Sequence, residues 1–391
     1  MQPPDRSLLR LLPRHSHELH ARRWSVVGTL LALALVLLSG CVLVPFAPAA
    51  QEPAATLQIE KAPDDRAAIL GLTQACIPTE RPANAFPTAV VGISTVYPLN
   101  STYYDRLKDL GVHWTRSEFI WQQIEKEPHG VYDWSTADAM VADHQKNGLS
   151  LLGDINYIPT YLQTWAEARD HFRTFMTALV DRYRPGGVLA RQKGWPTYGV
   201  THWQVFNEPN LTTSTGWMEG RPPAEYVGEY AGLLAVANAA IRAQDRSAVI
   251  VLGGLSPDDV TGMPYGKFFA AFYSYRTAPC FDVVGFHPYG RSGRFRQTAD
   301  EIRGLVKKNG DKDKPVWFDE YGTNTESQLK GAVEAMFHER DAVAVWFYFT
   351  LRDFGPTLAL QHYGLVNYDF QPKAPVYNTF KSGLAQSGWS G

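Results

Sequence analysis

The feature that most constrains the fold is a repeated alternation of short apolar segments with longer amphipathic ones. Eight segments rich in β-branched and aromatic residues are predicted as strands: 89–95, 112–119, 149–156, 201–206, 248–253, 281–287, 315–320 and 343–349. Segments with helical periodicity lie between them, and this order favours one parallel (β/α)8 barrel over an open sheet. A barrel of roughly 250 to 300 residues uses most of the 391-residue chain. We therefore predict a single barrel domain over residues 86–385.

Two of the predicted strands end in a glutamate. Residues 201–210 read T-H-W-Q-V-F-N-E-P-N, and Pro209, which has no N–H for a sheet, follows Glu208 directly. Residues 314–322, K-P-V-W-F-D-E-Y-G, place Glu320 after a second apolar run. Either glutamate could be an ordinary solvated residue, but the strand ends of a barrel meet at one mouth. Two carboxylates there predict acid–base cleavage of a glycosidic bond.

With N-E-P at one strand end and a second glutamate at a later one, the sequence resembles the clan A glycoside hydrolases. These are retaining (β/α)8-barrel enzymes, and the pattern is most similar to those of the family 39 and family 5 types. The resemblance covers about residues 86–384 and implies an enzyme that hydrolyses O-glycosidic bonds without a cofactor. It implies that Glu208 is the general acid and base and that Glu320 is the nucleophile.

The resemblance also assigns supporting residues around the two glutamates. Arg116 matches the arginine that holds the nucleophile ionised, and Tyr289 matches the tyrosine that donates a hydrogen bond to it. Asn207 matches the asparagine that binds the sugar 2-hydroxyl, where contacts tighten in the transition state. His287 is expected to line the same pocket, with a structural core histidine as the alternative.

Two tryptophans are further candidates for binding the substrate. Trp346, in the segment 343–349, matches the tryptophan floor of the cleavage subsite, although strand alternation could instead point it outward into the packing. Trp121, after the segment 112–119, is a candidate for stacking on a sugar ring, because exposing a tryptophan is costly. Asp154, Asn156 and Asp319 also lie near strand ends, but no role is assigned to them.

Composition excludes several other functions. The net charge of −2 gives no indication of nucleic acid as a partner, and the aromatic content of 13% suits a carbohydrate partner. No H-E-x-x-H, G-x-S-x-G or phosphate-binding loop occurs, and no close cluster combines histidine with cysteine, so we predict no metal and no cofactor. The second hypothesis is a membrane-anchored, non-catalytic sugar-binding barrel. We favour the enzyme because the sequence retains both glutamates and the residues expected to support them, some of which an inactive barrel would be expected to have lost.

The N-terminal part predicts export to the outside of the cytoplasm. Residues 1–23 are basic, whereas residues 24–46 carry no charge and are long enough to span a bilayer, with the basic end kept inside. Residues 38–41, L-S-G-C, resemble the bacterial lipobox, which makes Cys41 a candidate for lipidation. An uncleaved transmembrane anchor, a lipoprotein and a secreted protein cleaved near residues 47–49 remain as alternatives. We expect a bacterial, membrane-anchored or secreted monomer.

Residues 47–85 are rich in proline, alanine and polar residues, and they are predicted as a linker with a short helix over 64–72. The chain has three cysteines, and setting Cys41 aside leaves Cys76 and Cys280 as an even pair. Since exported proteins fold in an oxidising compartment, these two are candidates for a disulfide.

Overall fold

The computed structural model describes residues 65–96, 98–126, 129–211, 226–257, 262–355 and 362–389. The basic segment 1–23, the apolar segment 24–46 and Cys41 lie outside these ranges. Of the helices that the structure does describe, none has the length and hydropathy that a bilayer span requires.

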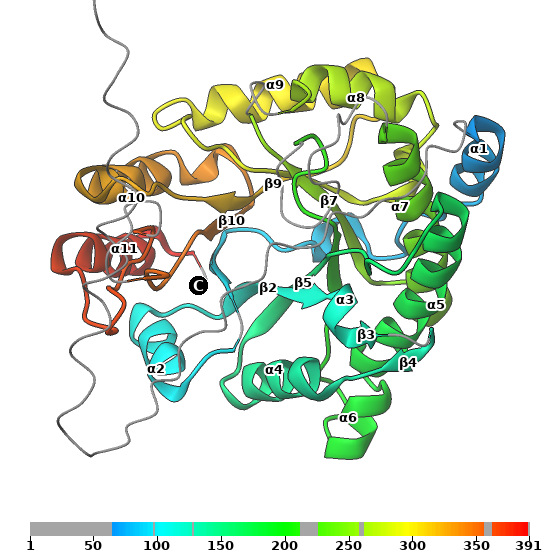
Figure 1. Cartoon of the computed structure of the whole chain (residues 1–391). Helices are drawn as coiled ribbons and strands as arrows, with labels where there is room; N and C mark the ends of the chain where they lie inside the picture. The colour runs from blue at the N-terminus through cyan, green and yellow to red at the C-terminus, as the bar shows by residue number, and fades with distance from the viewer. Residues whose placement is uncertain are drawn as a thin grey trace, which may run out of the picture. The chain divides into compact units, whose positions relative to one another are not determined.

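Eight parallel strands close into a barrel in the order β1-β10-β9-β8-β7-β6-β5-β2 (Figure 1). They are β1 (Val90–Thr95), β2 (Trp114–Ile120), β5 (Ser150–Asn156), β6 (His202–Val205), β7 (Val249–Leu255), β8 (Val283–Phe286), β9 (Val316–Tyr321) and β10 (Val345–Tyr348). The first and last strands pair directly, with Val90 opposite Val345, and this pairing closes the sheet. The predicted single (β/α)8 barrel is confirmed.

Helices surround the barrel, and their ends follow local capping signals. They are α1 (Arg66–Gln74), α2 (Ser101–Leu110), α3 (Trp121–Ile124), α4 (Ser135–Lys146), α5 (Trp165–Tyr183), α6 (Val188–Lys193), α7 (Val227–Gln244), α8 (Tyr265–Tyr273), α9 (Phe295–Lys308), α10 (Leu329–His338) and α11 (Ala374–Ser387). For example, the side chain of Thr164 accepts a hydrogen bond from the Glu167 N–H, so α5 begins at Trp165. A small hairpin of β3 (Glu125–Lys126) and β4 (Val131–Tyr132) follows α3.

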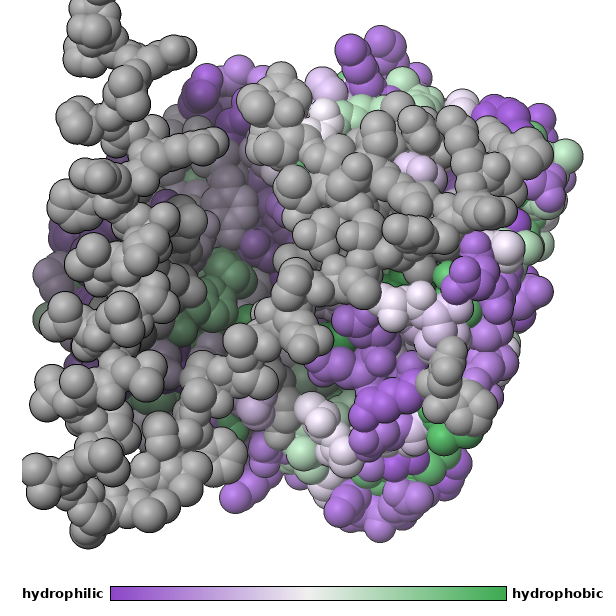
Figure 2. All heavy atoms as spheres, in the orientation of Figure 1, coloured by the Kyte–Doolittle hydropathy of each residue, from purple (hydrophilic) through white to green (hydrophobic). Residues whose placement is uncertain are grey.

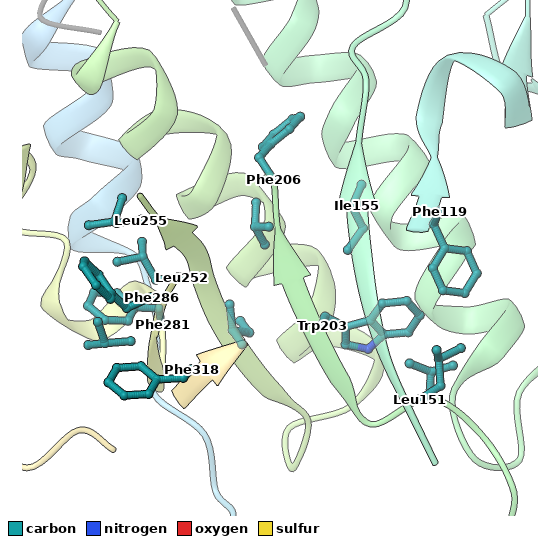
Figure 3. Packing of buried hydrophobic residues seen from close by; sticks show 14 of the residues in the cluster. Phe119, Leu151, Ile155, Trp203, Phe206, Leu252, Leu255, Phe281, Phe286 and Phe318 are labelled. Carbon is teal, nitrogen blue, oxygen red and sulfur yellow. The ribbon is translucent and has the colours of Figure 1, made fainter. Parts of the chain in front are cut away.

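The core has two layers because side chains along each barrel strand alternate between the inside and the outside. The inner layer consists of Val90, Leu152, Val249, Val251, Val283, Trp317, Val345 and Phe347. The outer layer lies between the strands and the helices, and Figure 3 shows part of it, including Phe119, Ile155, Trp203, Leu252 and Phe318. Over α4 and α6 the surface in Figure 2 is mainly hydrophilic, as expected for helices whose apolar faces pack inward.

The predicted linker is wrong for its last part, because residues 65–85 pack on the barrel domain. In α1, Ile69 is fully buried in the outer core layer. The N–H of Ile77 donates to Asn238 Oδ1 at 2.9 Å, and that of Thr79 donates to Asp282 Oδ1 at 3.1 Å. The folded domain therefore includes residue 65, rather than beginning at 86. A proline- and alanine-rich composition did not reveal these few anchoring contacts.

The predicted disulfide between Cys76 and Cys280 is present, with the two Cα atoms 4.9 Å apart. It joins the segment after α1 to the turn that precedes β8. Because it closes a loop over a sequence separation of 204 residues, it restricts the unfolded chain strongly. A contribution of about 2 to 5 kcal/mol to the free energy of unfolding is typical of such bridges.

Candidate active site

Arg116, on β2, is the centre of a buried hydrogen-bond network at the C-terminal end of the barrel. Its Nε donates to Gln204 Oε1 at 2.8 Å, and its Nη1 donates to Glu320 Oε2 at 2.9 Å. Its Nη2 donates both to Asp154 Oδ2 at 2.7 Å and to Asn207 Oδ1 at 2.6 Å. One guanidinium group thus connects β2, β5, β6 and β9 and fixes the relative positions of their side chains.

Burial and neighbouring charges have opposite effects on the pKa values of the residues in this network. Burial alone would lower the pKa of Arg116, but the carboxylates of Asp154 and Glu320 outweigh it and raise that pKa, so the guanidinium stays charged. Burial raises the pKa of Asp154 to about 7, although Arg116 opposes this shift. Asn156 donates to Asp154 Oδ2 at 2.8 Å and to Glu118 Oε1 at 3.1 Å. Asp154 and Asn156, to which the sequence assigned no role, therefore help to hold the Arg116 guanidinium in position.

Glu320, at the end of β9, accepts a hydrogen bond on each carboxyl oxygen. Arg116 donates to Oε2 at 2.9 Å, and the Tyr289 hydroxyl donates to Oε1 at 2.7 Å. Burial, followed by the charge of Glu320, raises the pKa of Tyr289 well above its ordinary value, so the hydroxyl remains a donor. Two fixed donors therefore orient the carboxylate, and one of them is a cation.

Glu208 follows β6 in a turn with unusual backbone geometry. Phe206 has a φ of 61° and Glu208 a φ of 43°, both in the left-handed region that non-glycine residues rarely adopt. The Glu208 N–H donates to the carbonyl of Gly254 on β7 at 3.1 Å. Strained backbone of this kind is concentrated at functional sites. Here it delivers the Glu208 side chain at the mouth of the barrel.

His287 connects Glu208 to a second buried carboxylate. Its Nδ1 lies 2.9 Å from Glu208 Oε1, and its Nε2 lies 3.7 Å from Asp319 Oδ2. Burial disfavours the charged imidazole, but the carboxylates of Glu320 and Asp319 outweigh it and raise the pKa of His287 to about 10. At neutral pH both ring nitrogens therefore carry protons, and Nδ1 donates to Glu208. A Cβ atom at Gly254 would overlap His287 and Asp319, so this strand position requires glycine.

A pocket of about 550 Å³ opens beside Tyr289 and the loop after β9. Its described lining has no charged side chain and consists of Tyr289, Gly290, Ser292, Gly322, Thr323, Asn324, Thr325, Gln328, Gly331, Ala332 and Tyr363. Burial, followed by the charges of Glu320 and Glu208, raises the pKa of Tyr363. Its ring packs edge-on against Phe349, at a centroid distance of 5.2 Å.

The structure does not bring the two predicted tryptophans into this site. Trp346 is fully buried on the outward side of β10, where it packs edge-on against Phe318 at 4.8 Å. Trp121 is fully buried against α5, stacks on Phe175 at 5.5 Å and donates to Glu125 Oε2 at 2.6 Å. The predicted sugar contacts of both residues are therefore wrong. Strand alternation explains the first, and packing of the loop on α5 explains the second.

The other six predicted residues form two hydrogen-bonded sets: Arg116, Asn207, Tyr289 and Glu320 in one, and Glu208 and His287 in the other. Gln204 and Tyr363 were missed, and Asp154 and Asp319 were noted near strand ends without the role in this group that the structure gives them. A polar residue on an apolar barrel strand was the available signal for Gln204, which is fully buried. Tyr363 had no such signal, because it reaches the site from a loop after β10.

Comparison with known proteins supports the fold. No family model matches the sequence, and no curated protein is significantly similar to it. A family 39 glycoside hydrolase from Bacteroides cellulosilyticus is similar at 17% identity over 76% of this chain, with a TM-score of 0.56, and this chain covers 64% of that protein. A glucosidase from Croceicoccus marinus is similar at 17% identity over 80% of this chain and 69% of its own, with a TM-score of 0.58.

An endo-1,4-β-mannanase from Rhizomucor miehei is similar at 15% identity, over 80% of this chain and 100% of its own, with a TM-score of 0.51. At these identities the likeness concerns the fold. The shared fold is a (β/α)8 barrel, as the sequence resemblance implied.

Proposed function

We propose that this chain is a retaining glycoside hydrolase in which Glu320 is the nucleophile and Glu208 is the general acid and base. The observation that carries the proposal is the different setting of the two carboxyls. Glu320 lies between the donors Arg116 and Tyr289, which suits an ionised nucleophile. Glu208 lies on a different strand end and contacts His287, which holds one of its oxygens.

In the first step, Glu320 attacks the anomeric carbon while Glu208 gives its proton to the glycosidic oxygen, and the bond to the leaving group breaks. Because His287 donates to Oε1 of Glu208, the acid proton is carried on Oε2. In the second step, Glu208 takes a proton from water, and the water oxygen displaces Glu320 from the anomeric carbon. Asn207, which accepts a hydrogen bond from Arg116, is the residue that binds the sugar 2-hydroxyl in this proposal.

The alternative of a non-catalytic sugar-binding barrel has less support. A binding protein does not need two carboxylates with separate partners, nor a strained turn that presents one of them. Burying the ionisable side chains of Arg116, Asp154 and Asp319 is costly, which a role in catalysis explains.

Among the described residues that line the pocket beside Tyr289, none is charged, which supports a neutral carbohydrate as the substrate. A carboxylated sugar would need a cation to offset its desolvation there. We therefore expect aryl glucosides or aryl mannosides to be hydrolysed at least about tenfold faster, in kcat/KM, than aryl glucuronides. A purified Glu320→Gln variant controls for contaminating hydrolases. Faster hydrolysis of a glucuronide would contradict this substrate class.

We also propose that the barrel is exported and held at the membrane through residues 24–46 or through a lipid on Cys41. The Cys76–Cys280 bridge supports export, because disulfides persist in oxidising compartments. Cell fractionation of the Cys41→Ser variant distinguishes the two attachments. A lipoprotein would fail to mature, whereas an uncleaved anchor would fractionate unchanged. Recovery of the unaltered protein entirely from the soluble exported fraction would contradict both.

A further inference from the structure

Three residues that could hold a metal ion lie together outside the group around Arg116. They are Glu125 on β3, His129 in the β3–β4 hairpin and His171 on α5, and their ligand atoms all lie within 4.8 Å of one another. The sequence predicted no metal because His171 is far from the other two along the chain. The packing of the hairpin on α5 brings it to them (Figure 1).

The carboxylate of Glu125 is held firmly at the base of this cluster. It is fully buried, although a buried glutamate is costly unless its charge is compensated. Trp121 Nε1 donates to Oε2 at 2.6 Å, and the Gly130 N–H donates to Oε1 at 2.9 Å. Hydrogen bonds of this kind orient a metal-binding carboxylate from its outer side. They also give Trp121 a structural role in place of the predicted contact with sugar.

The two histidines are arranged face to face above this carboxylate. Their rings stack at a centroid distance of 3.4 Å, and His129 Nδ1 lies 2.6 Å from Glu125 Oε1. His171 Nδ1 is buried and has no hydrogen-bond partner among the described residues.

We propose that Glu125, His129 and His171 bind one divalent transition-metal ion of the zinc type. Two imidazoles and a carboxylate are a common donor set for zinc and cobalt. Three ligands about 2.1 Å from a tetrahedral ion lie about 3.4 Å from one another, which small side-chain rotations reach from the observed spacing. The metal takes the place of the proton between His129 and Glu125, and a water completes its coordination. The His129 side chain is 38% exposed, which leaves a route for the ion.

This site would tie the loop after β2 to α5. The same loop contributes Gln123, Ile124 and Lys126 to a pocket of about 220 Å³ that Glu118 on β2 also lines. The bound ion would therefore stiffen one wall of this pocket, and Glu118 in its lining is linked to Arg116 through Asn156 and Asp154.

The test is metal binding by the full-length folded protein after treatment with a chelator. We expect calorimetry with zinc to give one ion per chain, and cobalt to give the visible absorption of a four-coordinate site. The substitutions His129→Ala and His171→Ala should each weaken zinc binding at least about 100-fold and remove the rise in melting temperature on adding zinc. His113→Ala, at an exposed histidine ahead of β2, is the matched control and should bind like the unaltered protein.

His129 is partly exposed, so its replacement should leave the fold intact even if that of His171 does not. Circular dichroism and the melting temperature without metal check this for each variant. The proposal is overturned if the folded protein shows no saturable binding of zinc or cobalt. It is equally overturned if folded His129→Ala binds zinc as tightly as the His113→Ala control.

Discussion

Replacing Glu320 by glycine should lower kcat by at least about 10⁴-fold, because no other described carboxylate occupies the position between Arg116 and Tyr289. Added azide should restore turnover. The missing side chain leaves space for the anion below the anomeric carbon, and Arg116 still supplies a positive charge there. A single displacement by azide gives a glycosyl azide of inverted configuration, which NMR of the product identifies.

Glu320→Gln is the matched control for this rescue. Glutamine fills the same space and retains an oxygen that can accept from Arg116 or Tyr289, so azide has no room to bind. We expect this variant to be inactive and to remain inactive with azide. A Glu320→Gly enzyme that keeps more than about a tenth of the original kcat, or that azide rescues with retention, would show that Glu320 is not the nucleophile.

Replacing Glu208 by alanine should have an effect that depends on the leaving group. Aryl glycosides with good leaving groups, such as dinitrophenol, need little proton donation, so their kcat/KM should fall only slightly. Substrates with poor leaving groups should lose about 10²- to 10⁴-fold in kcat/KM, which is the usual contribution of a general acid. The second step, which needs Glu208 as a base, should then limit kcat and produce an initial burst of the aryl alcohol.

Azide provides the diagnostic for this variant as well. It needs no general base, so it should accelerate the second step and give a glycosyl azide of retained configuration. Glu208→Gln, which keeps an oxygen that can accept from His287, should behave in the same way. An equal loss of kcat/KM for good and poor leaving groups would contradict the acid role of Glu208.

The strands and the two glutamates were predictable because they depend on local chemistry. Apolar β-branched runs form buried strands, and Pro209, which cannot join a sheet ladder, marks the end of the run that forms β6. A parallel barrel then brings all its strand ends to one mouth, whatever their separation in sequence. That is why Arg116 and Glu320, on β2 and β9, are in contact as expected.

The features that could not be predicted depend on the side of a strand to which a side chain points and on how the loops pack against the helices. The side of β10 on which Trp346 lies is set by the register of the barrel, which a run of consecutive apolar residues does not reveal. Trp121 is drawn to α5 by Phe172 and Phe175, and the same packing gathers Glu125 with the two histidines. Such contacts join a loop to a helix, and no periodicity in either segment marks them.

The most direct test of double displacement through Glu320 is the anomeric configuration of the first product that the unaltered enzyme releases. Proton NMR during the early hydrolysis of an aryl glycoside, before mutarotation, distinguishes the two anomers. Double displacement through Glu320 inverts the anomeric carbon twice, so the account predicts a first product with the configuration of the substrate. A first product of inverted configuration would contradict it, because Glu320 would then activate water rather than bond to the sugar.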